Sequence, residues 1–561
     1  MGSRPASRLK LKQETTRYYP ITSVINWLFH SSKGNRLQAA LNLLTGIAMV
    51  FLDFIFVWTT KKTIDIATQT NQSYAIIEAA LYLTAIITLR IILSICNKWI
   101  KALFGVKAQN QMQNKLLTNI LESDRKSIQK YHSGDLLNRL EKDVSNIVLF
   151  ITENVPNLIT VLFRLVGAFF LIYYFNMQLA CILLATIPLL FFPGKFYFRR
   201  MRRITHSIRQ SESRIQSLLQ ESIQQGLILK VMDSDQQITH KLSEIQSRLQ
   251  TETCTRTRYS SYSSLIINIT FSGGYLITFL WSATQLQAGI ITYGMMIAFI
   301  QLIGQIQSPI RSLTQLTPYF INCKTSAERL MELEKEIIKE DNRKKRLSHP
   351  LGIQCKNITF SYSDTQKKIL HQFSHDFTPG SRTAIIGETG IGKTTLTQLI
   401  LALQKAEKGE IWLYNKTVKV HIDNSTRCNF AYMPQGNTLF SGTIRSNLLI
   451  GNPKATEQEM KNVLRLVCAD FVFSHPKGLD RECGEQGQEL SQGQAQRICI
   501  ARTLLHKAAI YIFDEATSSL DSATENKILQ NISKAKDEKT YLFITHRENV
   551  LKYCTECIHF S

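Results

Sequence analysis

Apolar residues in the first 310 positions gather into long runs separated by polar stretches. Six of these runs are near the roughly 20 residues that a helix needs to cross about 30 Å of hydrocarbon. They are residues 37–60, 74–100, 155–175, 179–197, 262–284 and 289–310. Because backbone groups in lipid must be paired within the segment itself, unbroken runs of this length predict six membrane-spanning helices. The polar stretches after the second and fourth runs keep Leu and Ile at helical spacing, which predicts long helices in the cytosol.

The pattern changes in the second half of the chain. Short β-branched strands there alternate with helices and glycine-containing turns, which is typical of an α/β domain with a largely parallel sheet. The charged segment 324–350 joins the halves and is predicted to be a helical linker. The sequence thus predicts an all-α six-helix transmembrane domain over 37–323, preceded by a cytosolic segment, 1–36, and followed by an α/β domain over 351–561.

Composition changes this picture mainly through charge. Hydrophobic residues make up 44% of the chain and charged residues 19%, below the roughly 25% of ordinary soluble domains. The formal net charge of +23 fits a nucleic-acid binder or a membrane protein with basic loops. The 11 cysteines lack a zinc-type arrangement and are expected to be reduced thiols.

The basic residues are distributed asymmetrically around the apolar runs. They gather before the first run and after the second and fourth, whereas the connections at Asn176 and 283–288 carry none. By the positive-inside rule, both termini are predicted to be cytoplasmic, in a multi-pass protein of the plasma (inner) membrane. The charge is accounted for by these loops, so we do not expect nucleic-acid binding.

Ionisable residues interrupt the apolar runs at Asp53, Glu78, Arg90 and Arg164. Within a membrane such groups usually face a cavity or pair with one another. Arg90 and Arg164 fit an anionic substrate, and an internal pair such as Arg90 with Asp53 fits the same pattern. The sequence leaves both interpretations open.

A phosphate-binding pattern opens the α/β domain. A predicted strand, 382–386, leads into 387–394 (GETGIGKT), and an apolar helical run, 396–403, follows. This strand–loop–helix context predicts a P-loop, whose glycines let backbone N–H groups wrap phosphate oxygens. Lys393 is expected to reach the β- and γ-phosphates, and Thr394 to ligate Mg²⁺. The glycines of the pattern are Gly387, Gly390 and Gly392.

Two adjacent acids, Asp514 and Glu515, follow a second predicted strand, 509–513. A parallel sheet presents side chains at its strand ends to a ligand. Asp514 is expected to hold Mg²⁺, and Glu515 to orient or deprotonate the attacking water. A helix N-cap is the alternative for an isolated Asp-Glu pair, and the P-loop favours the catalytic interpretation.

The motifs in this order resemble those of ATP-binding cassette (ABC) transporters in the half-transporter exporter form, over nearly the whole chain. Residues 490–494 (LSQGQ) resemble the family signature LSGGQ. Gln492 replaces its first glycine, while Ser491 and Gly493, the implied phosphate contacts, are kept. Residues 134–139 with Asp143, and 221–233, are similar to the cytosolic loops that couple to the cassette.

The resemblance implies further roles in the nucleotide site. Tyr362 is expected to stack on adenine, Gln435 to contact Mg²⁺ and the membrane domain, and His546 to contact the γ-phosphate. Asp521 belongs to the loop that crosses between two cassettes. The implied ATP-binding residues are Tyr362, Gly387, Gly390, Gly392, Lys393, Thr394, Thr395, Ser491, Gly493, Gln494 and Asp521. The implied catalytic residues are Glu515, His546 and Gln435, and the implied metal ligands are Thr394, Gln435 and Asp514.

The resemblance also implies the activity: ATP hydrolysis drives transport by a dimer, with each nucleotide held between the P-loop of one chain and the signature of the other. A homodimer is favoured, and a heterodimer stays open. The expected cargo is an exported hydrophobic, lipid-like, peptide or drug-like substrate. One alternative is an importer on the exporter fold. Another is a nucleotide-gated channel or regulatory subunit, against which Glu515 and His546 argue. The chain stops fifteen residues after His546, so we expect an abbreviated C-terminal edge.

Overall fold

The chain forms two compact units in the computed structural model. Unit 1 comprises Met1–Leu116 and Leu136–Glu332, and unit 2 comprises Leu117–Asp135 and Leu333–Ser561. The structure describes residues 19–31, 33–69, 73–182, 194–340, 343–362, 368–388, 390–484, 487–534 and 538–560.

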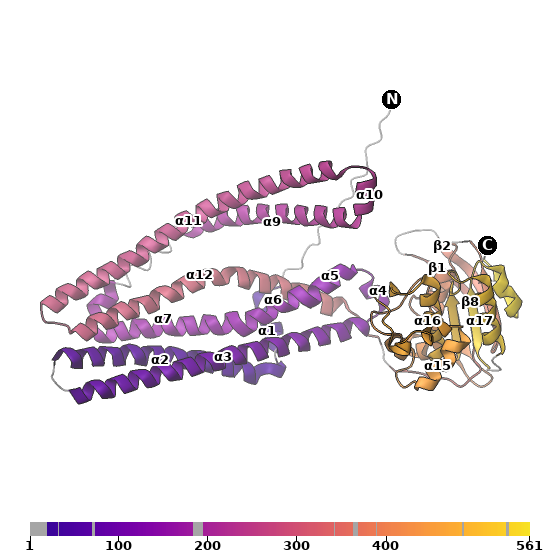
Figure 1. Cartoon of the computed structure of the whole chain (residues 1–561), viewed down its shortest axis with the longest axis horizontal. Helices are drawn as coiled ribbons and strands as arrows, with labels where there is room; N and C mark the ends of the chain where they lie inside the picture. Colours follow the sequence, from indigo (N-terminus) through magenta and orange to yellow (C-terminus); the bar gives the residue numbers. More distant parts are fainter. Residues whose placement is uncertain are drawn as a thin grey trace, which may run out of the picture. The chain divides into compact units, whose positions relative to one another are not determined.

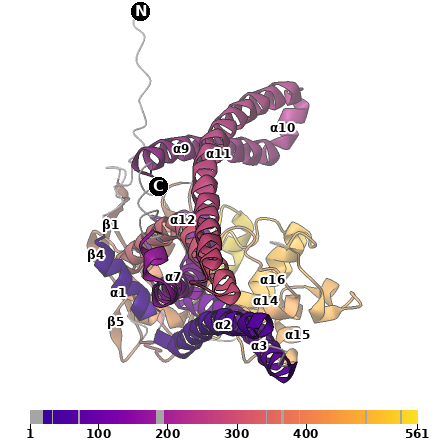
Figure 2. The ribbon, with the colours of Figure 1, turned by 90° about the vertical axis from the view of Figure 1, so that its left-hand side faces the viewer.

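Unit 1 is built from helices, as its apolar runs predict. Helices α9 and α11 lie side by side, and the short α10 joins them at one end (Figures 1 and 2). Three helices, α3, α5 and α12, extend by a few residues into unit 2. The helices of unit 1 are α1 (Ile21–Ser31), α2 (Arg36–Gln69), α3 (Ser73–Leu121), α5 (Ser133–Asn138), α6 (Val144–Leu149), α7 (Val155–Phe175), α9 (Gly194–Gln224), α10 (Gly226–Val231), α11 (Asp235–Gln287) and α12 (Tyr293–Glu336). Shorter helical turns are Lys33–Asn35, Arg139–Asp143 and Phe150–Asn154.

Among the described residues, four helices are long and apolar enough to cross a membrane. They are Lys33–Thr68, Ile76–Leu121, Ser133–Phe175 and Asp235–Gln287. These helices carry the first, second, third and fifth predicted spans. Most of the fourth, 179–197, lies outside the described residues. The sixth, 289–310, lies largely on α12 and is not among the four, because glutamines such as Gln301, Gln305 and Gln307 lower its hydropathy.

A hydrophobic cluster joins α2, α7 and α12 in unit 1. Val57, Ala168 and Phe299 are at most 1% exposed at its centre. Burial of each large apolar side chain contributes about 1.5–3 kcal/mol, so this cluster fixes the three helices against one another. Their other faces keep large apolar side chains exposed, as lipid-facing helices do.

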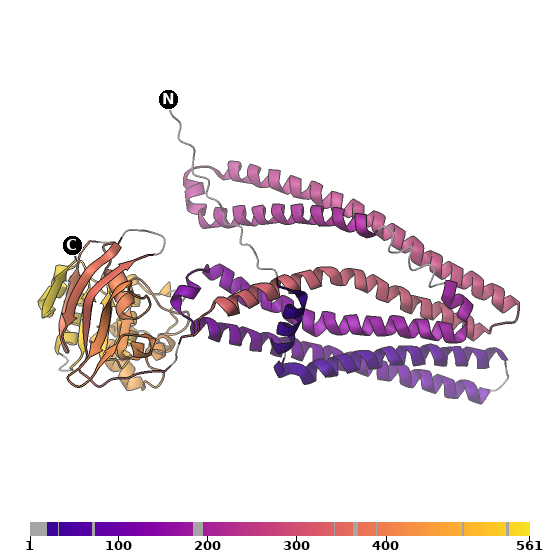
Figure 3. The same ribbon diagram turned by 180° about the vertical axis from the view of Figure 1, so that it is seen from behind.

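Unit 2 contains two sheets, seen side on in Figure 3. The first is antiparallel with the order β2-β1-β4-β5, and the second is parallel with the order β6-β7-β8-β3-β9. Every residue of β7 and β8 is buried, as expected for central parallel strands covered on both faces. The strands are β1 (Gly352–Ser361), β2 (Lys368–Phe377), β3 (Arg382–Ile386), β4 (Lys408–Tyr414), β5 (Lys419–His421), β6 (Phe430–Met433), β7 (Ile510–Asp514), β8 (Thr540–Ile544) and β9 (Glu556–His559).

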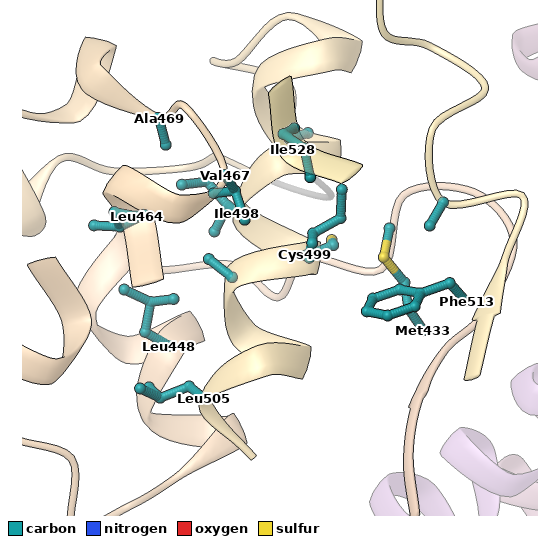
Figure 4. Packing of buried hydrophobic residues seen from close by; sticks show 14 of the residues in the cluster. Met433, Leu448, Leu464, Val467, Ala469, Ile498, Cys499, Leu505, Phe513 and Ile528 are labelled. Carbon is teal, nitrogen blue, oxygen red and sulfur yellow. The ribbon is translucent and has the colours of Figure 1, made fainter. Parts of the chain in front are cut away.

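Among the helices of unit 2, α16 packs against β6 of the parallel sheet, and α14 and α15 pack against α16. Figure 4 shows Ile498 and Cys499 of α16 within the buried cluster that also holds Leu464 and Phe513. This packing holds α16 against the strands that carry the site. The helices are α4 (Arg125–Ile128), α13 (Lys393–Ile400), α14 (Ile444–Gly451), α15 (Glu457–Leu466), α16 (Gln492–Leu505) and α17 (Ser522–Lys534). Shorter helical turns are Asn424–Asn429, Asp470–Val472, Gly478–Asp480 and Glu548–Tyr553.

The linker is helical only in its first part, which corrects the expectation of a helix over 324–350. Helix α12 ends at Glu336, and the chain then pairs with another segment of unit 2. Backbone hydrogen bonds of 2.9 Å join Asp124 N to the Ile338 carbonyl and Glu340 N to the Glu122 carbonyl. These bonds replace the helical ones, so the local helical spacing of the sequence does not decide the conformation here.

The C-terminal segment forms the edge strand β9, which pairs in parallel with β3. Each partner of β3 aligns with it in register: Ile385 lies opposite Ile544 of β8 and Ile558 of β9.

Candidate functional site

Four neighbouring parallel strands bring the phosphate loop, Gln435, Asp514, Glu515 and His546 to one edge of the sheet. The order β6-β7-β8-β3 within the parallel sheet places the carboxyl ends of these strands side by side. Gln435 follows β6, Glu515 follows β7 and His546 follows β8, while β3 leads into the phosphate loop. A ligand-binding crevice is expected at this position in a parallel sheet.

The phosphate loop after β3 requires glycine at its last turn. Gly392 has a φ of 117°, and a Cβ added there would lie 2.8 Å from Cγ2 of Ile369. Both the conformation and the close approach exclude a larger residue. Gly390 also has a positive φ, of 90°. Helix α13 begins directly after this loop, at Lys393, so its free N–H groups face the loop.

The ammonium group of Lys393 is held at this loop by backbone carbonyls. Lys393 is 7% exposed, and its Nζ donates to the Gly387 carbonyl and, at 3.0 Å, to the Glu388 carbonyl. Carbonyl dipoles stabilise the ammonium without neutralising its charge. The lysine therefore keeps a positive charge at the loop, available to an anionic ligand.

Lys393→Ala is expected to weaken ATP binding about 10- to 100-fold, because a charge-assisted hydrogen bond is lost. The measurement is the equilibrium dissociation constant for ATP with the full-length protein in detergent. Lys408→Ala, at an exposed position of β4, serves as the control and should bind like wild type. An unchanged ATP affinity in Lys393→Ala would remove Lys393 from the site.

Asp514, Thr394 and Tyr432 form a cluster of oxygen atoms beside the loop. Asp514 Oδ2 lies 3.5 Å from Thr394 Oγ1 and accepts a hydrogen bond of 3.3 Å from the Tyr432 hydroxyl. Burial raises the pKa of the Asp514 carboxyl and also raises the pKa of Tyr432. Oxygen donors from a hydroxyl and a carboxylate match the ligands that Mg²⁺ prefers, and a cation would offset the cost of ionising Asp514.

Glu515 is the centre of a second cluster. Its Oε2 accepts a 2.6 Å hydrogen bond from Gln435 Nε2, and its Oε1 lies 3.7 Å from His546 Nδ1. Glu515 has a φ of 49°, which is uncommon for a non-glycine residue, and its amide donates to the Ile544 carbonyl at 2.9 Å. The structure therefore brings together the three residues to which the sequence assigned catalysis. Gln435, also predicted as a metal ligand, contacts Glu515 here.

Tyr362 lies beside the start of α13. Its hydroxyl is 3.4 Å from Thr395 Oγ1, and its ring packs edge-on against Phe360 with 5.1 Å between centroids. The side chain remains 37% exposed. Phe360 fixes the ring while one aromatic surface stays accessible to a base.

The signature residues lie at the N-terminus of α16. Ser491 is the N-cap: its hydroxyl accepts a 3.2 Å hydrogen bond from Gln494 N, and Gln494 Oε1 accepts one from Ser491 N. Asp521 caps α17 in the same way through Thr524 N, which lowers the pKa of its carboxyl. In the described part of the chain, no hydrogen bond or ion pair joins Ser491, Gly493 or Gln494 to the phosphate loop.

Two residues that the sequence did not assign to the site connect its loops. Gln496 of α16 donates to the Glu515 carbonyl at 3.2 Å and accepts from Ser519 N at 2.9 Å. Arg547 follows His546 and donates to the carbonyls of Ser518 at 2.6 Å and Leu520 at 2.9 Å. The only local signal for these residues is their position next to recognised motifs.

Arg547 also pairs with Glu525, whose side chain is fully buried, at 3.2 Å. Arg547→Ala is expected to destabilise the protein by about 3–5 kcal/mol, because it leaves a buried carboxylate uncompensated. Thermal melting of the full-length protein measures this loss. Adding Glu525→Gln should recover part of it, whereas Arg445→Ala, at an exposed ion pair, should change little. No recovery in the double variant would contradict the buried-charge explanation.

Known proteins share the sequence patterns of both halves. A family model described as the ABC transporter transmembrane region matches residues 40–310, and one described as ABC transporter matches residues 370–518. Together they cover about three quarters of the chain.

Relatives of similar length match across most of the chain. A protein of Rickettsia felis that carries the name export ATP-binding/permease protein is 26% identical over 507 residues, which are 87% of this chain and 85% of the relative. An uncharacterized ABC transporter ATP-binding protein of Bacillus subtilis is 27% identical over 560 residues, covering 97% and 91%. The fold matches a bacterial Atm1-family ABC exporter with ATP bound, with a TM-score of 0.73 at 20% identity over 93% of each chain.

Proposed function

We propose a transport mechanism for this chain, which belongs to the ABC transporter family and is an integral membrane protein of the exporter type. The chain is an ATPase coupled to transmembrane transport. In the proposed mechanism, two copies bind two ATP molecules between their cassettes, and hydrolysis resets a substrate cavity in the membrane.

The contact of Gln435 and His546 with Glu515 is the observation that carries the hydrolysis step. The 2.6 Å hydrogen bond from Gln435 Nε2 orients Glu515 Oε2, and His546 Nδ1 lies 3.7 Å from the other carboxylate oxygen, Oε1. Glu515 orients the attacking water and takes its proton, and His546 donates to the γ-phosphate as charge develops on it. A channel or regulatory subunit that only binds ATP has no chemical need for this arrangement.

Thr394 and Asp514 would hold Mg²⁺, and Mg²⁺ would neutralise charge on the phosphates. Lys393 and the N–H groups at the start of α13 bind the phosphates, while Tyr362 packs against the adenine. These assignments rest on the contacts of 3.5 Å between Thr394 and Asp514 and of 3.4 Å between Tyr362 and Thr395.

The dimer is supported by two sets of accessible residues. Ser491, at the start of α16, is exposed and available to the nucleotide of a second chain. At the tip formed by α10, apolar side chains also remain exposed: Leu227 is 79% and Val231 80% exposed. Exposed apolar residues of this kind mark a protein contact, and we assign this tip to the cassette of the partner chain.

In the proposed function, the protein lies in the plasma (inner) membrane with both termini in the cytoplasm. It transports its cargo outward. The cargo is an apolar, lipid-like, peptide or drug-like molecule. The test is uptake of a fluorescent amphiphile into inside-out vesicles that contain the full-length protein. Uptake should require ATP and fail with a non-hydrolysable analogue. Vigorous ATP hydrolysis without uptake of any amphiphile would contradict transport, and uptake only into right-side-out vesicles would identify an importer.

A further inference from the structure

A polar cavity lies inside the membrane-spanning part of unit 1. Its volume is about 260 Å³, and α2, α3 and α7 line it. The side chains that face it recur at helical spacing on each helix. The polar members are Asn42 and Asp53 on α2, Arg90, Ser94, Asn97 and Lys101 on α3, and Asn157, Thr160 and Arg164 on α7. Three helices therefore turn polar stripes toward one another within otherwise apolar spans.

One buried carboxylate faces two guanidinium groups in this cavity. Asp53 Oδ2 accepts a 2.7 Å hydrogen bond from Arg164 Nη2, and its Oδ1 lies 3.1 Å from Arg90 Nε. The Asp53 side chain is only 7% exposed. The internal ion pair that the sequence left open is thus present, and it involves both arginines.

This pairing leaves positive charge in the cavity. One carboxylate cannot neutralise two guanidinium groups, and Lys101 adds a third cationic group to the lining. Lys101 has no ion-pair partner among the described residues. The buried Nε of Arg164 likewise has no hydrogen-bond partner there. Uncompensated charge at membrane depth is costly, so a cavity built this way favours an anion as its occupant.

Two asparagines that line the cavity are held by hydrogen bonds. Asn97 Nδ2 donates to Thr45 Oγ1 at 2.6 Å, and Asn42 Nδ2 donates to the Thr152 carbonyl at 2.8 Å. Asn42 and Asn97 are at most 6% exposed. These bonds connect α2 with α3 and with the segment before α7, so the cavity has a fixed polar wall.

The size of the cavity limits what it can hold. Pockets for drug-sized ligands measure roughly 300–1,000 Å³, so a cavity of about 260 Å³ accommodates a head group and not a large molecule. Met49, Val50 and Val161 add apolar surface to the same lining, which suits the first carbons of a chain attached to that head group.

We propose that this cavity binds the anionic head group, a phosphate or a carboxylate, of the molecule that the transporter carries. Arg90, Arg164 and Lys101 bind the anion, and Asp53 is the internal partner of both arginines until it arrives. This inference rests on the transport function proposed above, and it narrows the cargo to anionic molecules.

The test measures binding without ATP, so that it is independent of hydrolysis. The full-length protein, in phosphatidylcholine nanodiscs with ADP present, is titrated with dodecyl phosphate, dodecyltrimethylammonium or inorganic phosphate. Thermal melting gives an apparent affinity for each probe. Dodecyl phosphate should stabilise the protein saturably, and Arg164→Gln should weaken its binding at least about ten-fold. Lys61→Gln removes a cation of α2 that pairs with Asp65 outside the cavity, and it should bind dodecyl phosphate like wild type.

The probes distinguish the possible sources of the anion. Stabilisation by dodecyl phosphate alone supports an amphiphile, and an additional phosphate effect that Arg164→Gln abolishes supports a soluble anion. Equal binding of dodecyltrimethylammonium, or dodecyl phosphate binding that Arg164→Gln leaves unchanged, would overturn the proposal. ATP-dependent uptake into inside-out vesicles by the wild type, measured in parallel, shows separately whether the transport function holds.

Asp53→Asn provides a second variant in case Arg164→Gln does not fold. It releases both guanidinium groups from their internal partner while keeping the side chain's size. The proposal expects tighter binding of dodecyl phosphate by this variant, several-fold or more. If the ion pairs serve stability alone, Asp53→Asn lowers the melting temperature and leaves the affinity unchanged, which would also overturn the proposal.

Discussion

Glu515→Gln is expected to leave ATP binding intact and to slow hydrolysis by about 10²- to 10⁴-fold, the usual contribution of a positioned general base. The amide keeps the size of the carboxylate but cannot accept the proton of the attacking water. Gln435 and His546 would still contact the new side chain, so the geometry around the water changes little. The loss should therefore fall on the chemical step.

The measurement combines equilibrium ATP binding with single-turnover hydrolysis by the full-length protein in lipid. Glu457→Gln makes the same chemical change at an exposed position of α15 and serves as the matched control. Hydrolysis by Glu515→Gln at the wild-type rate would assign water activation to another group. A loss of ATP binding as well would place Glu515 in the binding of nucleotide.

Ser491→Arg is expected to abolish ATP hydrolysis by the purified chain, because a bulky cation then stands where the signature meets the γ-phosphate. In a homodimer each signature completes the site of the other chain, so both sites fail together. The assay is ATPase activity of the purified chain alone in lipid vesicles.

Ser491 also caps α16, so loss of the cap must be separated from the blocked site. Ser491→Ala removes the hydroxyl that accepts from Gln494 N, at a cost of about 1 kcal/mol, without adding bulk or charge. This control should fold and retain part of the activity. Inactivity of the wild-type chain alone, restored by co-expression with a neighbouring half-transporter, would contradict the homodimer.

The sequence could predict those parts of the site that depend on local pattern. The strand 382–386 coincides with β3, and the P-loop lies between β3 and α13 as its spacing requires. The second strand, predicted as 509–513, is observed as Ile510–Asp514, so Asp514 ends the strand and Glu515 follows it. Periodicity and glycine spacing report on a few consecutive residues, which is enough to locate a strand, a turn and a helix.

Contacts between distant segments could not be read in this way. The hydrogen bond from Arg547 to the Ser518 carbonyl joins the loops that follow β8 and β7. The sequence of either loop alone does not predict this bond. In the linker, the local pattern predicts a helix that the structure does not form. The helical spacing of the sequence continues past Glu336, but α12 ends there and the chain pairs with residues 122–124. Tertiary hydrogen bonds override a weak local preference in such places.

The sequence by itself determined the order of the two domains, the helical nature of the apolar runs that the structure describes, and the position of the glycine-rich loop between β3 and α13. Each of these depends on hydrophobic spacing and on local backbone requirements, which every window of sequence expresses. Only the tertiary structure decided which charged groups share a cavity. Asp53 and Arg164 are 111 residues apart, yet Asp53 meets both Arg164 and Arg90. The packing of α2, α3 and α7 brings these side chains together, and that packing depends on the whole unit.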